Sequence, residues 1–595
     1  MESKKCKRDK IDLSGFWDGE LKLNPEIDVA APEIIRRSFY VPLSWNMQIK
    51  DLQWPSEQQE LSAITRPVQN QNFRDKERKF SEGVITYHKD ITLQKKPGMR
   101  EFLVFEGSNF KTEVSINGKK VGENRNGHLK FEFDISDFVI DGENKFVITV
   151  DNFRDKDACP QEQFNWKNYG GIYRPFYIES RPDVYIKDYL VFPGKENGKW
   201  YADVNVSLNK SAESKIVIEI ISGLEKKSTE ITFGGKNTAS ARLFFDNPAV
   251  WKPGEGNISE IGLTLLQGND ETDRVRGKFG FRTIETKGRD ILVNGEKFRI
   301  LGASFHEQHP AFGNSVPGWQ WMSDLKLLKH CGLNAVRAAH YPYSQEFYDA
   351  CDREGIVCIA ELPCWQFNKY HFGNPYVLEF CSNYAETMVS QLGNHPSIIG
   401  WVVQNESKTF EPGAAEFFGG INTVFNENDP TRFTLTAESP EPPEHLAVIK
   451  KVKGSPSGEP PPTSRIIDVF GINDYSAWYG EKSTYLPQLI DHLTARVTDR
   501  PVIVSEFGAE ATSGVRSLSM PHYSEDFQAE LLCRHIREIL KRDEVSGFFL
   551  WLFFDYEGSS ISISGINAKG IVDLNRNPKL AFNMIKNIIK AENLK

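Results

Sequence analysis

The second half of the chain contains eight apolar runs that lack polar alternation, separated by stretches with helical spacing. Parallel strands that are buried on both faces have such continuous apolar sequences, and crossover helices join them. Eight such units in about 300 residues is the size of a (β/α)8 barrel, so a TIM barrel is predicted over residues 285–595. The runs are KFRILGASFHE (297–307), LNAVRAAHY (333–341), IVCIAELP (356–363), SIIGWVVQNE (397–406), RFTLTAES (432–439), IIDVFGINDYS (466–476), PVIVSEFG (501–508) and VSGFFLWLFFD (545–555).

The stretches between the runs carry helix boundaries. Residues 317–332 (PGWQWMSDLKLLKHCG) begin with a proline and end on a glycine, and residues 344–355 (SQEFYDACDREG) also end on a glycine. The segment 439–465 is rich in Pro, Ser and Lys and is typical of a surface insertion.

Two further domains are predicted before the barrel, as expected for a chain of 595 residues. Residues 1–182 contain short alternating runs broken by Gly, Asn and Asp, which favours a β-sandwich of the jelly-roll kind. Residues 183–284 contain roughly seven short strands, the size of an immunoglobulin-like sandwich. The fold class is therefore a jelly-roll sandwich, an immunoglobulin-like sandwich and a TIM barrel in one chain.

Composition excludes several functional classes. The net charge is -9 and no long run of one sign occurs, so no nucleic-acid partner is predicted. The eight cysteines include no C-x-x-C pair, which favours neither a zinc ribbon nor a disulfide scaffold and fits a reduced compartment. No apolar run reaches the roughly 18 residues of a membrane span, so a cytoplasmic protein without a membrane partner is predicted.

Polar residues close nearly every apolar run of the predicted barrel. Any single one of them could simply face water or pair with a loop. Active sites of such barrels form at the carboxyl ends of the strands, and a ring of carboxylates, imidazoles, amides and aromatic rings suits a hydroxyl-rich sugar. The residues are His306, Glu307, His340, Glu361, Glu406, Glu438, Asn473, Tyr475, Glu506 and Asp555.

Glu406 and Glu506 form a chemically sensible pair for glycoside hydrolysis. Glu406 closes the fourth run and Glu506 the seventh, so their side chains can face each other across the barrel. Glycosidases use two carboxyl groups, about 5 to 5.5 Å apart when the anomeric configuration is retained. Spacing alone does not assign which glutamate is the acid and which is the nucleophile.

Over nearly its whole length the sequence resembles glycoside hydrolase family 2, most of all the bacterial β-glucuronidases of that family. The segments that carry the resemblance are LSGFWDGELKL, VPLSWN, NWKNYGGIYRP, FGFRTIETKGRDILVNGEKFRILGASFHEQHP, HYPYSQEFYDACDREGIVCIAELP, NHPSIIGWVVQNES, INDYSAWYG and PVIVSEFGAE. The resemblance implies a retaining exo-β-glucuronidase that acts on a small-molecule or oligosaccharide β-glucuronide.

The resemblance also implies roles for individual residues. Glu406 is expected to be the general acid/base and Glu506 the nucleophile, while Asn405 holds the sugar 2-hydroxyl. Asn567 and Lys569 are expected to bind the uronate carboxylate, because an ammonium supplies the counter-charge and an amide a directed hydrogen bond. The other predicted substrate-binding residues are Asn165, His340, Asn473, Tyr475, Tyr479 and Trp551.

Alternatives remain open at this stage. Asn165 and Ile563 depart from better-known glucuronidases, which leaves a galacturonide, the C4 epimer, as a second substrate. A β-galactosidase and a non-catalytic carbohydrate-binding protein are further alternatives. The HEQH segment at 306–309 lacks the spacing of a helical zinc site, so neither a metal nor another cofactor is predicted. A homo-oligomer, a dimer or a tetramer, is expected from the family.

Overall fold

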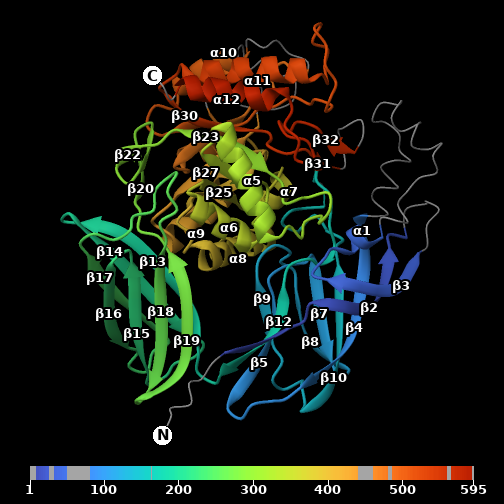
Figure 1. Ribbon diagram of the computed structural model, residues 1–595, viewed down its shortest axis with the longest axis vertical. Coiled ribbons are helices and arrows are strands. Elements are labelled where there is room, and N and C mark those ends of the chain that lie inside the picture. The colour runs from blue at the N-terminus through green and yellow to red at the C-terminus, as the bar shows by residue number, and fades with distance from the viewer. Residues whose placement is uncertain are drawn as a thin grey trace.

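The computed structural model describes residues 8–25, 33–49, 81–162, 164–439, 460–479, 485–558 and 565–592. In the view of Figure 1 a closed barrel lies above two β-sandwiches, the N-terminal one in blue at the lower right and the central one in teal and green at the lower left. The predicted fold class is thus confirmed, whereas the exact boundaries at 182/183 and 284/285 stay predictions. Across the described ranges, no helix is long and apolar enough to pass through a membrane.

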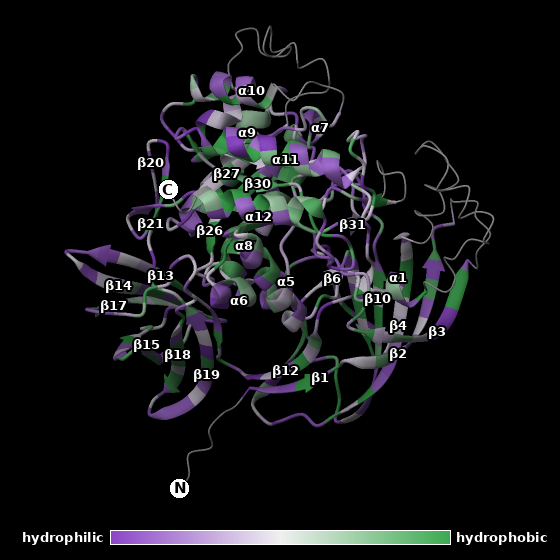
Figure 2. Ribbon diagram, turned by 45° about the horizontal axis from the view of Figure 1, so that its top comes forward, coloured by the Kyte–Doolittle hydropathy of each residue, from purple (hydrophilic) through white to green (hydrophobic). Residues whose placement is uncertain are grey.

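The barrel consists of eight parallel strands in closed sequential order, and each matches one of the predicted runs. Every residue in these strands is buried, which explains why the runs show no polar alternation. Figure 2 shows hydrophobic residues concentrated on them. The strands are β23 (Ile300–Phe305), β24 (Ala335–Ala338), β25 (Val357–Glu361), β26 (Ile398–Asn405), β27 (Phe433–Glu438), β28 (Val469–Asn473), β29 (Val502–Glu506) and β30 (Val545–Leu550).

Helices surround the barrel, and the two with predicted boundaries are confirmed. α5 and α6 end at Gly332 and Gly355, whose φ angles of 90° and 64° lie in the left-handed region that glycine adopts without strain. Residues 440–459 of the predicted insertion lie outside the described residues. The helices are α5 (Gly318–Cys331), α6 (Gln345–Glu354), α7 (Lys369–Phe372), α8 (Pro375–Leu392), α9 (Ala414–Asn428), η2 (Pro462–Arg465), α10 (Tyr485–Thr494), α11 (Glu525–Leu540) and α12 (Leu580–Glu592).

The N-terminal domain is a sandwich of a four-stranded and a six-stranded sheet, in the orders β1-β12-β5-β9 and β3-β2-β4-β10-β7-β8. The rings of Trp17 and Phe176, one from each sheet, lie 5.4 Å apart in the shared core. The elements are β1 (Asp9–Asp12), β2 (Gly15–Leu23), β3 (Ile34–Val41), α1 (Trp45–Gln48), β4 (Gly83–Leu93), β5 (Met99–Phe105), β6 (Ser108–Asn109), β7 (Lys111–Ile116), β8 (Lys119–Asn124), β9 (Phe131–Asp134), β10 (Gly142–Asp151), β11 (Gly171–Ile172) and β12 (Phe176–Pro182).

The central domain pairs a three-stranded sheet (β13-β14-β17) with a four-stranded sheet (β16-β15-β18-β19), as an immunoglobulin-like sandwich does. A small sheet of β20, β21 and β22 leads into the barrel, and β31 pairs with β32 after it. The strands are β13 (Ile186–Glu196), β14 (Lys199–Leu208), β15 (Lys215–Ser222), β16 (Glu225–Thr232), β17 (Thr238–Phe245), β18 (Ser259–Gln267), β19 (Asp270–Phe279), β20 (Ile284–Lys287), β21 (Asp290–Val293), β22 (Glu296–Lys297), β31 (Tyr556–Glu557) and β32 (Ile566–Asn567).

Buried arginines attach both sandwiches to the barrel. Arg174 of the N-terminal domain forms an ion pair of 2.6 Å with Glu307, which follows β23. Arg282, just after β19, donates hydrogen bonds to the carbonyl oxygens of Pro396 and Ile398, which lie at the start of β26. Glu307 was a strand-end candidate from the sequence, and the structure uses it to hold two domains together.

Candidate active site

The carboxyl ends of the parallel strands bring polar side chains from five of them to one end of the barrel. Arg337 comes from β24, Glu361 ends β25, Asn405 ends β26, Asn473 ends β28 and Glu506 ends β29. All five are at most 3% exposed. Buried polar groups require partners, and these residues supply them to one another.

Arg337 lies at the centre of this network. Its Nε donates to Glu361 Oε2 at 2.7 Å, its Nη1 to Glu506 Oε1 at 2.7 Å, and its Nη2 to Asn405 Oδ1 at 2.9 Å. Burial alone would raise the pKa of Glu361, but the charges of Arg337 and His340 outweigh it and lower that pKa. One guanidinium therefore positions two carboxylates and the amide of Asn405. Arg337 was not among the residues predicted from the sequence, although a charged residue inside an apolar run was a signal.

Glu506 is buried and held by two donors. Besides Arg337, the hydroxyl of Tyr475 donates to Glu506 Oε2 at 2.7 Å. Burial raises the pKa of Glu506 and the nearby Glu406 carboxylate adds to the rise, whereas Arg337 and the Tyr475 hydrogen bond oppose it. The carboxylate thus has a fixed orientation and two groups that stabilise its ionised form.

Glu406 follows β26 in a backbone conformation that few residues adopt. Its φ is 52°, in the left-handed region, where a non-glycine residue costs of order 1 kcal/mol or more unless its surroundings enforce it. The side chain accepts hydrogen bonds from Asn473 Nδ2 at 3.1 Å and Gln366 Nε2 at 3.2 Å. Glu406 is half-buried, so its carboxyl group is accessible from the barrel mouth. Asn473 also donates to Asn405 Oδ1, which links Glu406 to the Arg337 network.

Some buried polar atoms in the site lack a partner among the described residues. They include Asn405 Nδ2 and both ring nitrogens of His306. Such atoms are costly to bury unless something else completes their hydrogen bonds. A ligand rich in hydroxyl groups would do so, which makes these atoms candidate contacts for a sugar.

Aromatic side chains surround these polar atoms. The Trp551 ring stacks on His340 with centroids 4.8 Å apart and an interplanar angle of 19°. Trp166, from the N-terminal domain, lies 5.7 Å from His306 and 5.6 Å from His340. The first domain therefore reaches the barrel mouth of its own chain. Asn165, the residue before Trp166, is half-buried.

Lys569 lies near Tyr475, the residue whose hydroxyl donates to Glu506. The ammonium is 1% exposed, bonds to Glu510 Oε1 at 3.2 Å, and lies 5.8 Å from the Tyr475 ring centroid. Trp478 and Tyr479 lie 5.7 and 5.4 Å away. The Lys569 backbone N–H donates to Asn567 Oδ1, so the turn that carries both residues is internally ordered. Glu510 was missed in the sequence.

Two strand-end carboxylates belong to other networks. Glu438 accepts hydrogen bonds from the hydroxyls of Thr409, Thr436 and Thr463. Asp555 pairs with Lys579 at 2.8 Å. Ile563 lies outside the described residues.

Comparison with known families places this arrangement in a class. A profile of "Glycosyl hydrolases family 2, TIM barrel domain" matches residues 284–593, that of the family's sugar binding domain matches 26–182, and the general profile of the family matches 184–282. The protein is a glycoside hydrolase. It belongs to glycosyl hydrolase family 2, and the profile of the catalytic domain spans the residues that form the barrel.

Individual relatives are similar along most of the chain. A β-glucuronidase of Paenibacillus borealis is 26% identical over 512 residues, covering 80% of this chain and 82% of that protein. The structure of a β-D-glucuronidase from Dictyoglomus thermophilum matches with a TM-score of 0.81 at 26% identity, covering 99% of this chain and 98% of that one. A β-galacturonidase from Eisenbergiella tayi bound to galacturonate shares the fold, with a TM-score of 0.80, 24% identity and coverages of 99% and 98%.

Proposed function

We propose that the chain is a retaining exo-β-glucuronidase in which Glu506 is the nucleophile and Glu406 the general acid/base. The observation that carries this proposal is the position of Lys569, a buried ammonium near Tyr475, whose hydroxyl donates to Glu506. A uronide is the sugar class whose carboxylate such a cation would bind. The two glutamates supply the hydrolytic chemistry, and the lysine supplies the substrate class.

The first chemical step uses both glutamates. The ionised Glu506 attacks the anomeric carbon, the bond from that carbon to the aglycone oxygen breaks, and Glu406 gives its proton to the departing oxygen. Arg337 and Tyr475 support this step because they stabilise Glu506 as a carboxylate and fix its direction. The unpaired Nδ2 of Asn405 is a suitable donor to the sugar 2-hydroxyl.

The second step releases the sugar. Glu406, now a carboxylate, takes a proton from water, and the water oxygen attacks the anomeric carbon while Glu506 departs as a carboxylate. Two inversions give net retention of the β configuration. Asn473 and Gln366 donate to Glu406 and orient it for both tasks.

The substrate carboxylate would join Lys569 in the space bounded by the aromatic rings. Glu510 already pairs with Lys569, so the lysine is charged and held in place before substrate binds. Asn567 lies on the same turn, and its Nδ2 donates to the Tyr556 hydroxyl at 3.3 Å. Binding would bring that amide and the ammonium to one carboxylate, which combines a charge with a directed hydrogen bond.

A galacturonide is the second candidate substrate. It carries the same carboxylate, so Lys569 does not distinguish the two epimers. Asn165 departs from the better-known glucuronidases and is next to Trp166, which contacts the rings of the barrel mouth. We propose that this loop takes part in the choice at C4.

A panel of p-nitrophenyl β-glycosides tests the proposal, with kcat/KM measured on the glucuronide, galacturonide, galactoside and glucoside. Preference for the glucuronide is the expected result. Preference for the galacturonide would support Lys569 as the carboxylate-binding residue, but the substrate would then be the C4 epimer of the proposed one. Preference for a neutral sugar would overturn the role of Lys569, and absence of turnover on all four would favour a non-catalytic binding protein.

A further inference from the structure

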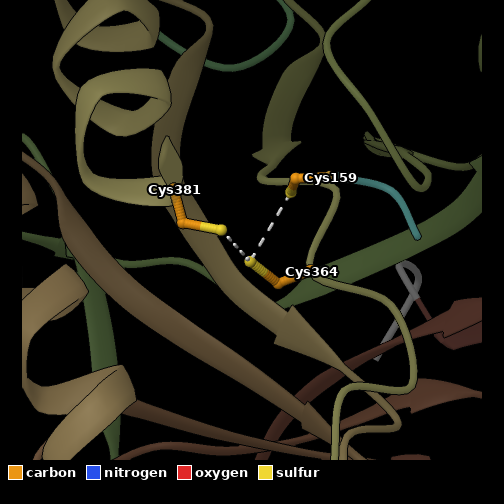
Figure 3. Close-up of side chains that lie close together, drawn as sticks. All are labelled: Cys159, Cys364 and Cys381. Carbon is orange, nitrogen blue, oxygen red and sulfur yellow. Dashed lines mark hydrogen bonds between the residues drawn. The ribbon is translucent and has the colours of Figure 1, made fainter. Parts of the chain in front are cut away.

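Three cysteines distant in sequence meet at the boundary between the N-terminal domain and the barrel. Cys159 lies in the loop between β10 and β11, Cys364 follows β25, and Cys381 lies in α8. Cys364 Sγ is 3.8 Å from Cys159 Sγ and 3.6 Å from Cys381 Sγ, and all three sulfur atoms lie within 4.8 Å of one another. Figure 3 shows the side chains converging from three separate segments.

The separations of the sulfur atoms match those of metal-bound thiolates. Zinc–sulfur bonds of about 2.3 Å place tetrahedral ligand sulfurs about 3.8 Å apart. A disulfide would instead require two sulfurs to approach to about 2.05 Å and would leave the third thiol unused. The cluster can therefore accept an ion with little movement, while oxidation demands a larger rearrangement.

The three sulfurs are buried, and a cation lies in the same loop as one of them. All three cysteines are at most 1% exposed, and Arg154 is five residues before Cys159. Arg154 donates to the carbonyl of Pro160, next to Cys159, and its Nε has no partner within the described part of the chain. Its Nη2 donates to Asn109 Oδ1 at 2.7 Å, and no carboxylate among the described residues forms an ion pair with it, so its charge can balance an anionic cluster.

We propose that Cys159, Cys364 and Cys381 form a three-thiolate site for a closed-shell, thiophilic metal ion such as Zn2+ or Cd2+. Binding converts M2+ and three thiols into an [M(SR)3]- centre and three released protons. Arg154, in the same loop as Cys159, can balance the single negative charge of this centre. No metal was predicted from the sequence, so this proposal differs from that expectation, and it does not depend on the identity of the sugar substrate.

The proposed metal site would stabilise the folded protein. One ion would join the loop of the N-terminal domain to the barrel. It would lie next to residues 364–366, which bind the backbone of Asn405, the residue before the predicted acid/base Glu406. The carbonyl oxygen of Cys364 accepts the backbone N–H of Asn405 at 3.0 Å, and the Gln366 N–H donates to the Asn405 carbonyl at 2.8 Å. An ion bound only in the folded state raises the apparent stability of the protein.

Uptake is expected to be slow. All three thiols are at most 1% exposed, so an ion reaches them only after a local rearrangement of the chain. A surface site would fill on mixing, whereas this one fills at the rate of that rearrangement.

Titration with Cd2+ tests the proposal on the full chain, purified with reductant and freed of metal by a chelator. We expect one equivalent to bind per chain, with a thiolate-to-Cd2+ charge-transfer band in the ultraviolet, release of protons in unbuffered solution, and a rise in Tm. Cys381→Ala should weaken binding at least tenfold and remove the band. Cys533→Ala, which removes an equally buried thiol from α11, should retain both.

Each other outcome overturns the assignment. Absence of the band in the native protein, or an equal band in the Cys381→Ala variant, would mean that these thiols do not bind the ion. A disulfide between any two of them in air-exposed protein would indicate a redox pair. If Cys381→Ala does not fold, as judged by circular dichroism, Cys159→Ser provides the same comparison from the loop, with binding equal to the native protein again refuting the site.

Discussion

Replacement of Lys569 by methionine tests how the substrate class is selected. The side chain is 1% exposed and, among the described residues, forms an ion pair only with Glu510, at 3.2 Å. Removing one member of a buried charge pair costs about 2 to 5 kcal/mol. If the substrate carboxylate contacts this ammonium, kcat/KM for the glucuronide should fall roughly 30- to 5,000-fold, because about 1.4 kcal/mol corresponds to a factor of ten.

Part of the expected loss in kcat/KM comes from Glu510. In the Lys569→Met variant, the Glu510 carboxylate stays in the site and repels the uronate. The double variant Lys569→Met/Glu510→Gln removes that repulsion, so it should hydrolyse the glucuronide faster than the single variant. Turnover of a neutral β-galactoside, which carries no carboxylate, should differ little between the two.

A matched control separates recognition from stability. Arg432→Met removes another buried cation, one that pairs with Asp429 at 2.6 Å just before β27, at the opposite end of the barrel strands. It should lower Tm without changing the ratio of glucuronide to galactoside kcat/KM. The reasoning is refuted if Lys569→Met leaves that ratio within threefold of the native value, or if Arg432→Met changes it as much.

Three further predictions concern the network around Glu506 and the domain boundary. Tyr475→Phe removes a hydrogen bond that lowers the pKa of Glu506; since Glu506 must be ionised to attack, the acidic limb of the kcat/KM profile should move to higher pH, and an unchanged limb would contradict this. Glu506→Gln should reduce kcat by at least about 10³-fold, and NMR of the native reaction should show the β anomer first, whereas an α product would exclude retention. Arg174→Met should lower the free energy of unfolding by about 3 to 5 kcal/mol because it leaves Glu307 buried and unpaired; denaturant unfolding within 1 kcal/mol of native would refute that role.

The fold was predictable because the burial of each strand determines the pattern of apolar and polar residues in its sequence. Barrel strands such as β26 are buried at every position, so they read as unbroken apolar runs. Sandwich strands such as β10 bury alternate residues and read as alternating ones. Both patterns are local, and a single sequence therefore contains them.

From residue patterns alone, without the family resemblance, the site was predictable only where it follows from strand ends. Asn405, Asn473 and Glu506 end their strands, and their convergence follows from the parallel barrel. The contact between Arg337 and Glu506 spans 169 residues, and that between Lys569 and Glu510 spans 59. No local pattern specifies such pairs.

The cysteine cluster shows the same limit more strongly. Cys159 and Cys364 are separated by 205 residues and lie in different domains. Metal-binding cysteines are recognised in a sequence by short spacings, and none occurs here. Only the packing of the loop after β10 against the barrel brings the three sulfurs together.

The position of Trp166 has a consequence for biosynthesis. The ribosome completes the N-terminal sandwich before the barrel strands emerge, and domains generally fold in that order. The Trp166 ring contacts His306 and His340. It is therefore already in place when the later strands form the mouth of the barrel. A barrel expressed without the N-terminal sandwich would lack the Trp166 ring beside His306 and His340, so we expect synthesis of an active protein to require both domains in one chain.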